Sequence, residues 1–178
     1  MRMVRGAKIR FGKALVKKKM LANAVELQTT RLCDYAKSEI EEMAKRLSGR
    51  YEDKTYNLQD SLVWCVYYGG NLKKHGYYGS KKAKEDSYLH AWSKNPPPQN
   101  VDGRALAKAF VAEYHPSIVN GWEIVWAAAA PYSAYLEGGF QLHGRFRQFY
   151  VITQRYDHIK RTLEPLCVVD YEINVPVY

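Results

Sequence analysis

Apolar residues recur at steps of three, four or seven between Leu21 and Leu47. This spacing places them on one face of a helix, while charged residues fall mostly on the other sides. The apolar face consists of Leu21, Val25, Leu32, Ala36, Ile40, Met43 and Leu47. Ser48-Gly49 ends the pattern, because glycine suits the left-handed position that follows a helix. The pattern predicts a helix of about 28 residues, which is longer than most helices of globular domains.

Two strands are expected after this helix. Residues 62–68 are all apolar, aromatic or β-branched, which favours a strand that is covered on both faces. Gly69-Gly70-Asn71 suits a tight turn. A second strand should therefore run back from this turn towards Tyr77.

Residues 80–118 leave this pattern, and we interpret them as one long surface excursion. Three prolines at 96–98 remove three backbone donors, so they cannot lie inside a helix or a central strand. A short helix is expected to begin near Asp102, which can cap it, and to stop before Pro116. Its apolar residues are Leu106, Phe110 and Val111.

The last third of the chain contains two strand patterns and one helix pattern. Residues 122–126 alternate as a half-buried strand does. A final helix is expected from 149 to 163, closed by Pro165. Its inner face would consist of Val151, Ile152, Tyr156, Ile159 and Leu163. Residues 168–178 alternate again and predict a C-terminal strand, in which Pro176 suits a sheet edge.

This order of elements indicates an α+β fold, with a long N-terminal helix and a C-terminal helix packed on an antiparallel sheet. The length of 178 residues fits one domain. We assign residues 20–178 to it, with 80–118 as a long insertion or loop. An edge strand is a liability unless it is paired. The C-terminal strand, 168–178, should therefore pair with the sheet of its own or an adjacent subunit.

Positive charge is concentrated at the N-terminus. Residues 1–19 form a basic arm that accounts for most of the net charge of +9, and the first acidic residue is Glu26. The basic residues of the arm are Arg2, Arg5, Lys8, Arg10, Lys13, Lys17, Lys18 and Lys19. The arm is either a contact for DNA phosphate or for an acidic partner, or a solvated tail. With few apolar anchors it cannot offset an ordering cost of roughly 1–2 kcal/mol per residue, so we expect it to order only on assembly.

No motif for catalysis or metal binding is present. The histidines lack an HExxH pair, the serines lack a Gly-x-Ser-x-Gly elbow, and the cysteines lack a CxxC pair. We expect Cys33, Cys65 and Cys167 to be reduced and to pack like small apolar groups. The glycine-rich stretch 138–144 lacks the ending of a phosphate loop and is interpreted as a flexible turn. The sequence predicts no catalytic residue, no metal and no cofactor.

Aromatic residues offer one more candidate contact. Arg145 and Arg147 neighbour Phe146 and Phe149, so they could hold phosphates beside a stacked base, or simply form a solvated turn. The 15 tyrosines and four tryptophans suit either wide partner surfaces or the core of the sheet. No apolar run reaches the roughly 18 residues of a membrane span, and no signal peptide is evident. The chain is therefore expected to stay in the cytoplasm where it is made.

Two segments resemble one protein family. Residues 55–62, Thr-Tyr-Asn-Leu-Gln-Asp-Ser-Leu, are similar to the Asp-Thr-Gly-x-Leu-x-x-Ser-Ile signature of small tail-completion proteins of long-tailed phages, the "gene product ten-like" neck family. The resemblance carries over to Thr55, Asn57, Leu58 and Ser61. Asn57 stands where the family has glycine, and we therefore expect a positive φ there or at its immediate neighbour.

The second segment, residues 132–139, reads Tyr-Ser-Ala-Tyr-Leu-Glu-Gly-Gly and resembles the family's Tyr-Ala-x-Tyr-Val-Glu-x-Gly-Thr segment. Here the resemblance carries over to Tyr132, Tyr135, Glu137 and Gly138. We predict that the Glu137 carboxylate accepts hydrogen bonds from backbone donors or pairs with an arginine, against the alternative of a surface glutamate at a turn. The resemblance covers residues 20–79 and 120–164, and the long excursion departs from it.

The resemblance implies structural work and no enzyme activity. Such a protein forms or completes a ring at the phage head–tail junction. It would be made in the bacterial host cytoplasm and located in the virion neck. Its partners would be copies of itself and other neck, portal or tail proteins, with packaged DNA as a further contact and no membrane. The alternatives are a small basic nucleic-acid-binding protein and an unrecognised nuclease or toxin-like enzyme.

Overall fold

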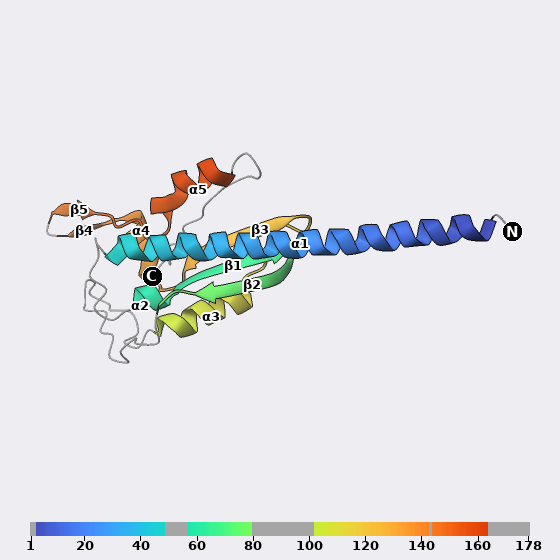
Figure 1. Cartoon of the computed structure of the whole chain (residues 1–178). Coiled ribbons are helices and arrows are strands. Elements are labelled where there is room, and N and C mark those ends of the chain that lie inside the picture. Colours follow the sequence, from blue (N-terminus) through green and yellow to red (C-terminus); the bar gives the residue numbers. More distant parts are fainter. Residues whose placement is uncertain (1–2, 49–56, 80–101, 143, 164–178) are drawn as a thin grey trace.

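A computed structural model describes residues 3–48, 57–79, 102–142 and 144–163. In chain order the elements are α1 (Met3–Ser48), α2 (Asn57–Asp60), β1 (Leu62–Tyr68), β2 (Asn71–Tyr77), α3 (Gly103–Glu113), β3 (Trp122–Ala128), α4 (Ser133–Gly138), β4 (Phe140–Leu142), β5 (Arg145–Arg147), the 3-10 helix η1 (Thr153–Arg155) and α5 (Tyr156–Leu163). Figure 1 shows a three-stranded sheet crossed by the long α1, so the predicted α+β class is confirmed.

The sheet is antiparallel throughout, in the order β2-β1-β3. The β1–β2 turn has positive φ at both central residues, 59° at Gly69 and 74° at Gly70. Two such angles suit the right-handed twist of a hairpin and are readily adopted by glycine. The two predicted strands and the tight turn between them are therefore confirmed.

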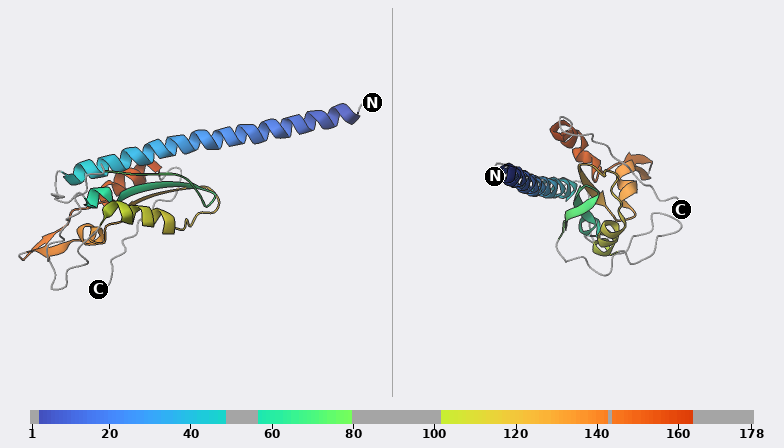
Figure 2. Two further views of the ribbon diagram at one scale, coloured as in Figure 1. Left: turned by 90° about the horizontal axis from the view of Figure 1, so that it is seen from below. Right: turned by 90° about the vertical axis from the view of Figure 1, so that its right-hand side faces the viewer.

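The central strand β1 is covered on both faces, as its composition predicted. Alternate residues of β1 fall into two clusters: Leu62, Trp64 and Val66 pack with α1, and Val63, Cys65 and Tyr67 pack with α3. Figure 2 shows α1 and α3 on opposite sides of the sheet. From α1 the fully buried side chains are Ala36, Ile40, Met43, Ala44 and Leu47. The helical periodicity of the sequence therefore identified the main core correctly.

The interpretation of 80–118 as a surface excursion is wrong for α3, and residues 80–101 lie outside the described residues. Helix α3 is capped as expected, with the Asp102 carboxylate accepting from the Ala105 N–H at 3.0 Å, and it ends before Pro116. However, Ala107 is completely buried against the sheet, so α3 forms the second layer of the core. The sequence pattern missed this because an 11-residue amphipathic helix does not reveal which surface it covers.

α1 has 46 residues and begins at Met3, so the predicted start near residue 20 is wrong. The backbone of the basic arm from residue 3 onward is part of this helix. Lysine, arginine, alanine and leucine, which dominate the arm, are good helix formers, and no proline interrupts them. At about 1.5 Å per residue the helix is roughly 70 Å long. Its N-terminal half extends well beyond the sheet (Figure 1).

The last helix begins later than predicted. Residues 149–152 are not helical, and Tyr150 has a φ of 50°, the one positive value outside glycine in the described chain. Most of the expected inner face is confirmed, since Val151 and Ile159 are buried and Ile152 and Leu163 are partly buried against the same core. Tyr156 is partly buried but is not part of this cluster. The stretch 138–144, interpreted as a flexible turn, contributes β4, which pairs with β5. The predicted strand 168–178 lies outside the described residues.

Candidate assembly surfaces

The projecting half of α1 carries three exposed apolar side chains. Met20 and Leu21 are both 66% exposed and Leu27 is 56% exposed, whereas buried residues begin at Cys33. The basic positions from 5 to 19 belong to this same part of the helix, and Arg2 lies outside the described residues. From Met20 to Leu27 this half presents exposed apolar side chains, and its backbone extends beyond the sheet (Figure 1).

The β4–β5 hairpin is a second exposed surface. Arg145, Phe146 and Arg147 are all exposed, and the Phe146 ring lies over Gly139, where a Cβ would meet it at 2.1 Å. Phe149 instead packs against the main core, so it cannot join the predicted stacking cluster. Figure 1 shows the hairpin at one end of the molecule and the start of α1 at the other. The structure does not bring the two predicted basic contacts together.

Glu137 anchors the base of this hairpin to the last helix. Glu137 is 6% exposed, and its carboxylate accepts from the backbone N–H groups of Ile152 and Thr153, each at 2.8 Å. The Thr153 hydroxyl also donates to it. A carboxylate at the start of a helix accepts hydrogen bonds from N–H groups that have no partner within the helix. Its negative charge also interacts favourably with the helix dipole. The predicted acceptor role of Glu137 for backbone donors is confirmed, and an arginine partner is not observed among the described residues.

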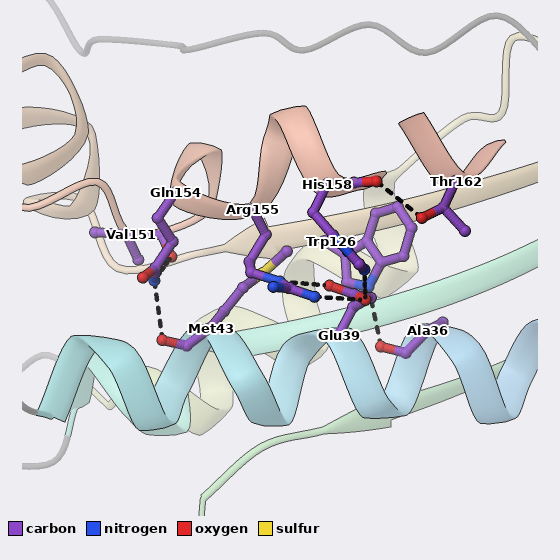
Figure 3. Close-up of polar contacts among 9 residues, drawn as sticks. All are labelled: Ala36, Glu39, Met43, Trp126, Val151, Gln154, Arg155, His158 and Thr162. Carbon is purple, nitrogen blue, oxygen red and sulfur yellow. Dashed lines mark hydrogen bonds and ion pairs between the residues drawn. The ribbon is translucent and has the colours of Figure 1, made fainter. Parts of the chain in front are cut away.

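A buried ion pair joins the last helix to α1, as Figure 3 shows. The Arg155 guanidinium donates to both carboxylate oxygens of Glu39, at 2.8 and 3.0 Å. The Glu39 side chain is 5% exposed and the Arg155 side chain is 11% exposed, and the hydrogen bonds to Glu39 raise the pKa of Arg155. The imidazole Nε2 of His158 lies 3.3 Å from the same carboxylate. Sequence reasoning missed this pair, although an acidic residue between Ala36 and Ile40 on the apolar face was a signal.

Three further hydrogen bonds lie along the contact of α1 with η1 and β3, and two of them reach α1 (Figure 3). The Gln154 side-chain amide donates to the backbone oxygens of Met43 and Val151, each at 2.9 Å. The Trp126 indole N–H donates to the Ala36 oxygen at 3.0 Å. Together with the ion pair they fix α1, β3 and the last helix relative to one another. The projecting half of α1 is therefore attached to a rigid base.

The first family-like segment is a junction between α2 and α3. The positive φ expected at Asn57 or its immediate neighbour is not found at Asn57 or Leu58, which are helical, and the other neighbour, Tyr56, lies outside the described residues together with Thr55. The Asn57 side-chain oxygen accepts from the Gly103 N–H at 3.1 Å, and a Cβ on Gly103 would lie 2.0 Å from the Asn57 backbone oxygen. The position therefore needs a short amide side chain facing a glycine, and its backbone conformation is ordinary.

The remaining family-like residues also have structural surroundings. Leu58 and Ser61 are fully buried, and the Ser61 hydroxyl donates to the Leu58 oxygen at 2.8 Å. Tyr132 packs against the main core, and Gly138 is exposed at the end of α4. Tyr135 lies within α4. None of these positions combines a nucleophile with a base.

Beside this junction, Arg104 ties α3 to the hairpin. Its guanidinium donates to the backbone oxygens of Tyr78 and Gly79, at 2.6 and 3.1 Å, and lies 3.5 Å from the Asp60 carboxylate. It also lies over the Tyr77 ring at 4.8 Å from the centroid. All of these contacts serve to hold elements together.

Reactive groups in the described parts are buried or scattered. Cys33 and Cys65 are free and buried, which confirms their predicted state, and Cys167 lies outside the described residues. Burial raises the pKa of the Cys65 thiol to about 11, so this thiol is neutral near pH 7. The described residues contain no group of three or more histidine, cysteine or acidic side chains that could hold a metal ion. Nor do they contain a helix long and apolar enough to cross a membrane.

Comparisons with known proteins add no relatives. No family model, no curated protein and no solved structure matches this chain.

Proposed function

We propose that this chain is a structural protein of a bacteriophage neck, which forms or completes a ring at the head–tail junction. The observation that carries the proposal concerns α1, in which the buried side chains among the described ones all lie between Cys33 and Leu47. Its other half presents the exposed apolar residues Met20, Leu21 and Leu27. An isolated helix is marginally stable in water, and exposed apolar groups mark interaction sites. A neighbouring subunit would cover this half.

The roles of the two family-like segments support the same proposal. One forms the α2–α3 junction, and the other caps the last helix through Glu137. Both segments hold neighbouring elements of the domain in fixed positions, and a ring subunit requires such rigidity. Head-to-tail contacts between such blocks close into a ring by rotation. The partners would be copies of the chain and other neck, portal or tail proteins, with the basic arm beside packaged DNA.

The experiment measures assembly of the full chain by light scattering and electron microscopy. We expect the parent to form a large oligomer of defined mass. A triple variant with Met20→Ser, Leu21→Ser and Leu27→Ser should lose this oligomer. The free energy of unfolding of its monomer should change by no more than about 0.5 kcal/mol. The matched control, Asn23→Ser with Ala24→Ser, alters exposed positions of the same turns and should assemble normally. A parent that stays monomeric at every concentration, or a triple variant that assembles like the parent, contradicts the proposal.

The alternative function is a small basic nucleic-acid-binding protein. The observation that favours it is the concentration of basic residues in the arm, with no acidic residue before Glu26. Phosphate contacts make affinity depend on salt, with a slope of about 0.9 per contact. The measurement is DNA affinity of the isolated chain against salt concentration.

A matched pair of variants distinguishes DNA binding by the arm from an unspecific effect of the net charge of the protein. The arm variant replaces Lys17, Lys18 and Lys19 by glutamine. The control replaces the exposed lysines Lys37, Lys45 and Lys108 by glutamine, which removes the same charge from the domain. If the arm binds DNA, only the arm variant lowers the salt slope. Equal losses from both variants would show unspecific attraction, and an affinity without salt dependence would exclude this alternative.

A further inference from the structure

Among the described residues, no strand pairs with the outer edge of β3. The bonds Gly69 N–H to Gly121 O (3.0 Å) and Ala129 N–H to Ser61 O (3.1 Å) lie at the two ends of the β1–β3 ladder. Because antiparallel pairs alternate, the backbone groups of Glu123, Val125 and Ala127 point towards β1. Those of Trp122, Ile124 and Trp126 point away from it, and β3 has no second neighbouring strand among the described residues.

The two edges of this sheet differ in how they are protected. Residues 71–75 of the edge strand β2 are exposed. The charges of Lys73 and Lys74 disfavour the pairing of another strand with this edge. β3 is partly buried along its whole length and carries one charged residue, Glu123. Its far end is closed, because the Ala128 oxygen accepts from the Ser133 hydroxyl at 2.7 Å. A largely apolar edge that carries a single charged residue is a template for another strand.

The last helix leads the chain back to the start of this edge. Gln154 contacts Met43, and His158 contacts Glu39, so η1 and α5 run along α1 in the opposite direction (Figure 3). Figure 1 shows α5 running back beside β3, opposite to the direction of that strand. Leu163, the end of α5, packs in the same core cluster as Trp122 and Ile124. The last helix therefore runs towards the end of the sheet at which β3 begins (Figure 1).

We propose that the C-terminal segment of the same chain, residues 169–175, adds to this edge as a strand parallel to β3. Parallel strands need a long crossover, usually with a helix, and η1–α5 is such a crossover. Between α5 and this strand lie residues 164–168. Five residues reach at most roughly 16–18 Å, more than the roughly 10 Å between packed layers.

The composition of the segment fits the site. Its apolar positions are Val169, Tyr171, Ile173 and Val175. They alternate with polar residues, so one face can join the tryptophans of β3 under α5 while the other faces outward. Pro176 has no N–H, so the pairing should end at Val175. The resulting strand has the length of β3, seven residues. The inference does not depend on the proposed function.

Amide hydrogen exchange of the full chain tests this pairing residue by residue. The N–H groups of Ile124 and Trp126 should be protected in the full chain. Deletion of residues 168–178 should speed their exchange by on the order of tenfold or more. The internal control is Val125 and Ala127, whose N–H groups face β1 and should stay protected in both proteins. Equal exchange of Ile124 and Trp126 in the two proteins would overturn the proposal.

A point variant tests the same pairing without removing the C-terminal segment, in case the deletion disturbs the rest of the fold. In a parallel strand whose apolar side faces α1, the Glu172 N–H points towards β3, so Glu172→Pro should speed exchange at Ile124 and Trp126. Glu172→Gln changes only the charge and should leave it unchanged. Protection that rises with protein concentration would show a strand donated by a second copy and would overturn the assignment to the same chain.

Discussion

The two halves of α1 form one continuous helix, but different forces act on them. From Cys33 to Leu47 the helix buries one face against β1 and the last helix, and an ion pair reinforces that seam. From Met20 to Leu27 comparable apolar side chains are exposed. Helical periodicity is thus present in both halves, but only one has a surface to pack on. Periodicity determines which face of a helix is apolar, and the rest of the fold determines whether that face is covered.

The largest difference between the halves should come from the ion pair. Glu39→Ala leaves the buried Arg155 guanidinium without its partner, which should cost about 3–5 kcal/mol of unfolding free energy. Glu41→Ala on the same helix removes an exposed pair with Lys37 and should cost less than about 0.5 kcal/mol. Denaturant unfolding of both variants measures the contrast. Similar losses would show that Glu39 is solvated in the folded protein.

A hydrophobic truncation compares the two halves directly. Ile40→Ala empties a fully buried position and should cost about 2–5 kcal/mol. Leu21→Ala changes a side chain that is 66% exposed and should stay within about 0.5 kcal/mol in the free monomer. Thermal unfolding at low protein concentration is the measurement. If Leu21→Ala were as damaging as Ile40→Ala, the N-terminal half would be packed within the monomer.

The Glu137 cap gives a smaller effect outside α1. Glu137→Ala removes the acceptor for two backbone N–H groups at the start of the last helix and should cost about 1–3 kcal/mol. Glu137→Gln keeps one acceptor oxygen and should retain part of this stability. Chemical denaturation separates the three proteins. A parent-like Glu137→Ala variant would mean that water replaces the carboxylate without cost.

The smallest effect on stability is expected from removal of the arm. Deletion of residues 1–19 should leave the melting temperature of the monomer nearly unchanged, because buried contacts of α1 begin at Cys33. It should weaken assembly if the projecting half is a subunit contact. Calorimetry and light scattering on the same samples measure both quantities. A large drop in melting temperature would show that the arm stabilises its own domain.

The sequence by itself determined the elements whose signals are local. A continuous apolar and β-branched run located β1, turn chemistry located its hairpin, alternation located β3, and the cap at Asp102 located α3. The spacing of Ala36, Ile40 and Met43 identified the packed face of α1, because a helix repeats every 3.6 residues whatever surrounds it. These patterns need only a few neighbouring residues, so they can be read without the fold.

Tertiary structure decided the contacts between distant segments. Arg155 meets Glu39 across 116 positions, and Gly103 meets Asn57 across 46. The resemblance predicted a backbone role for Asn57, whereas its side chain bonds the start of α3. The last helix starts late because Tyr150 and the Glu137 cap redirect the chain before it. Such contacts depend on how whole layers pack, since each polar group finds its partner only after the apolar faces have fixed the distances.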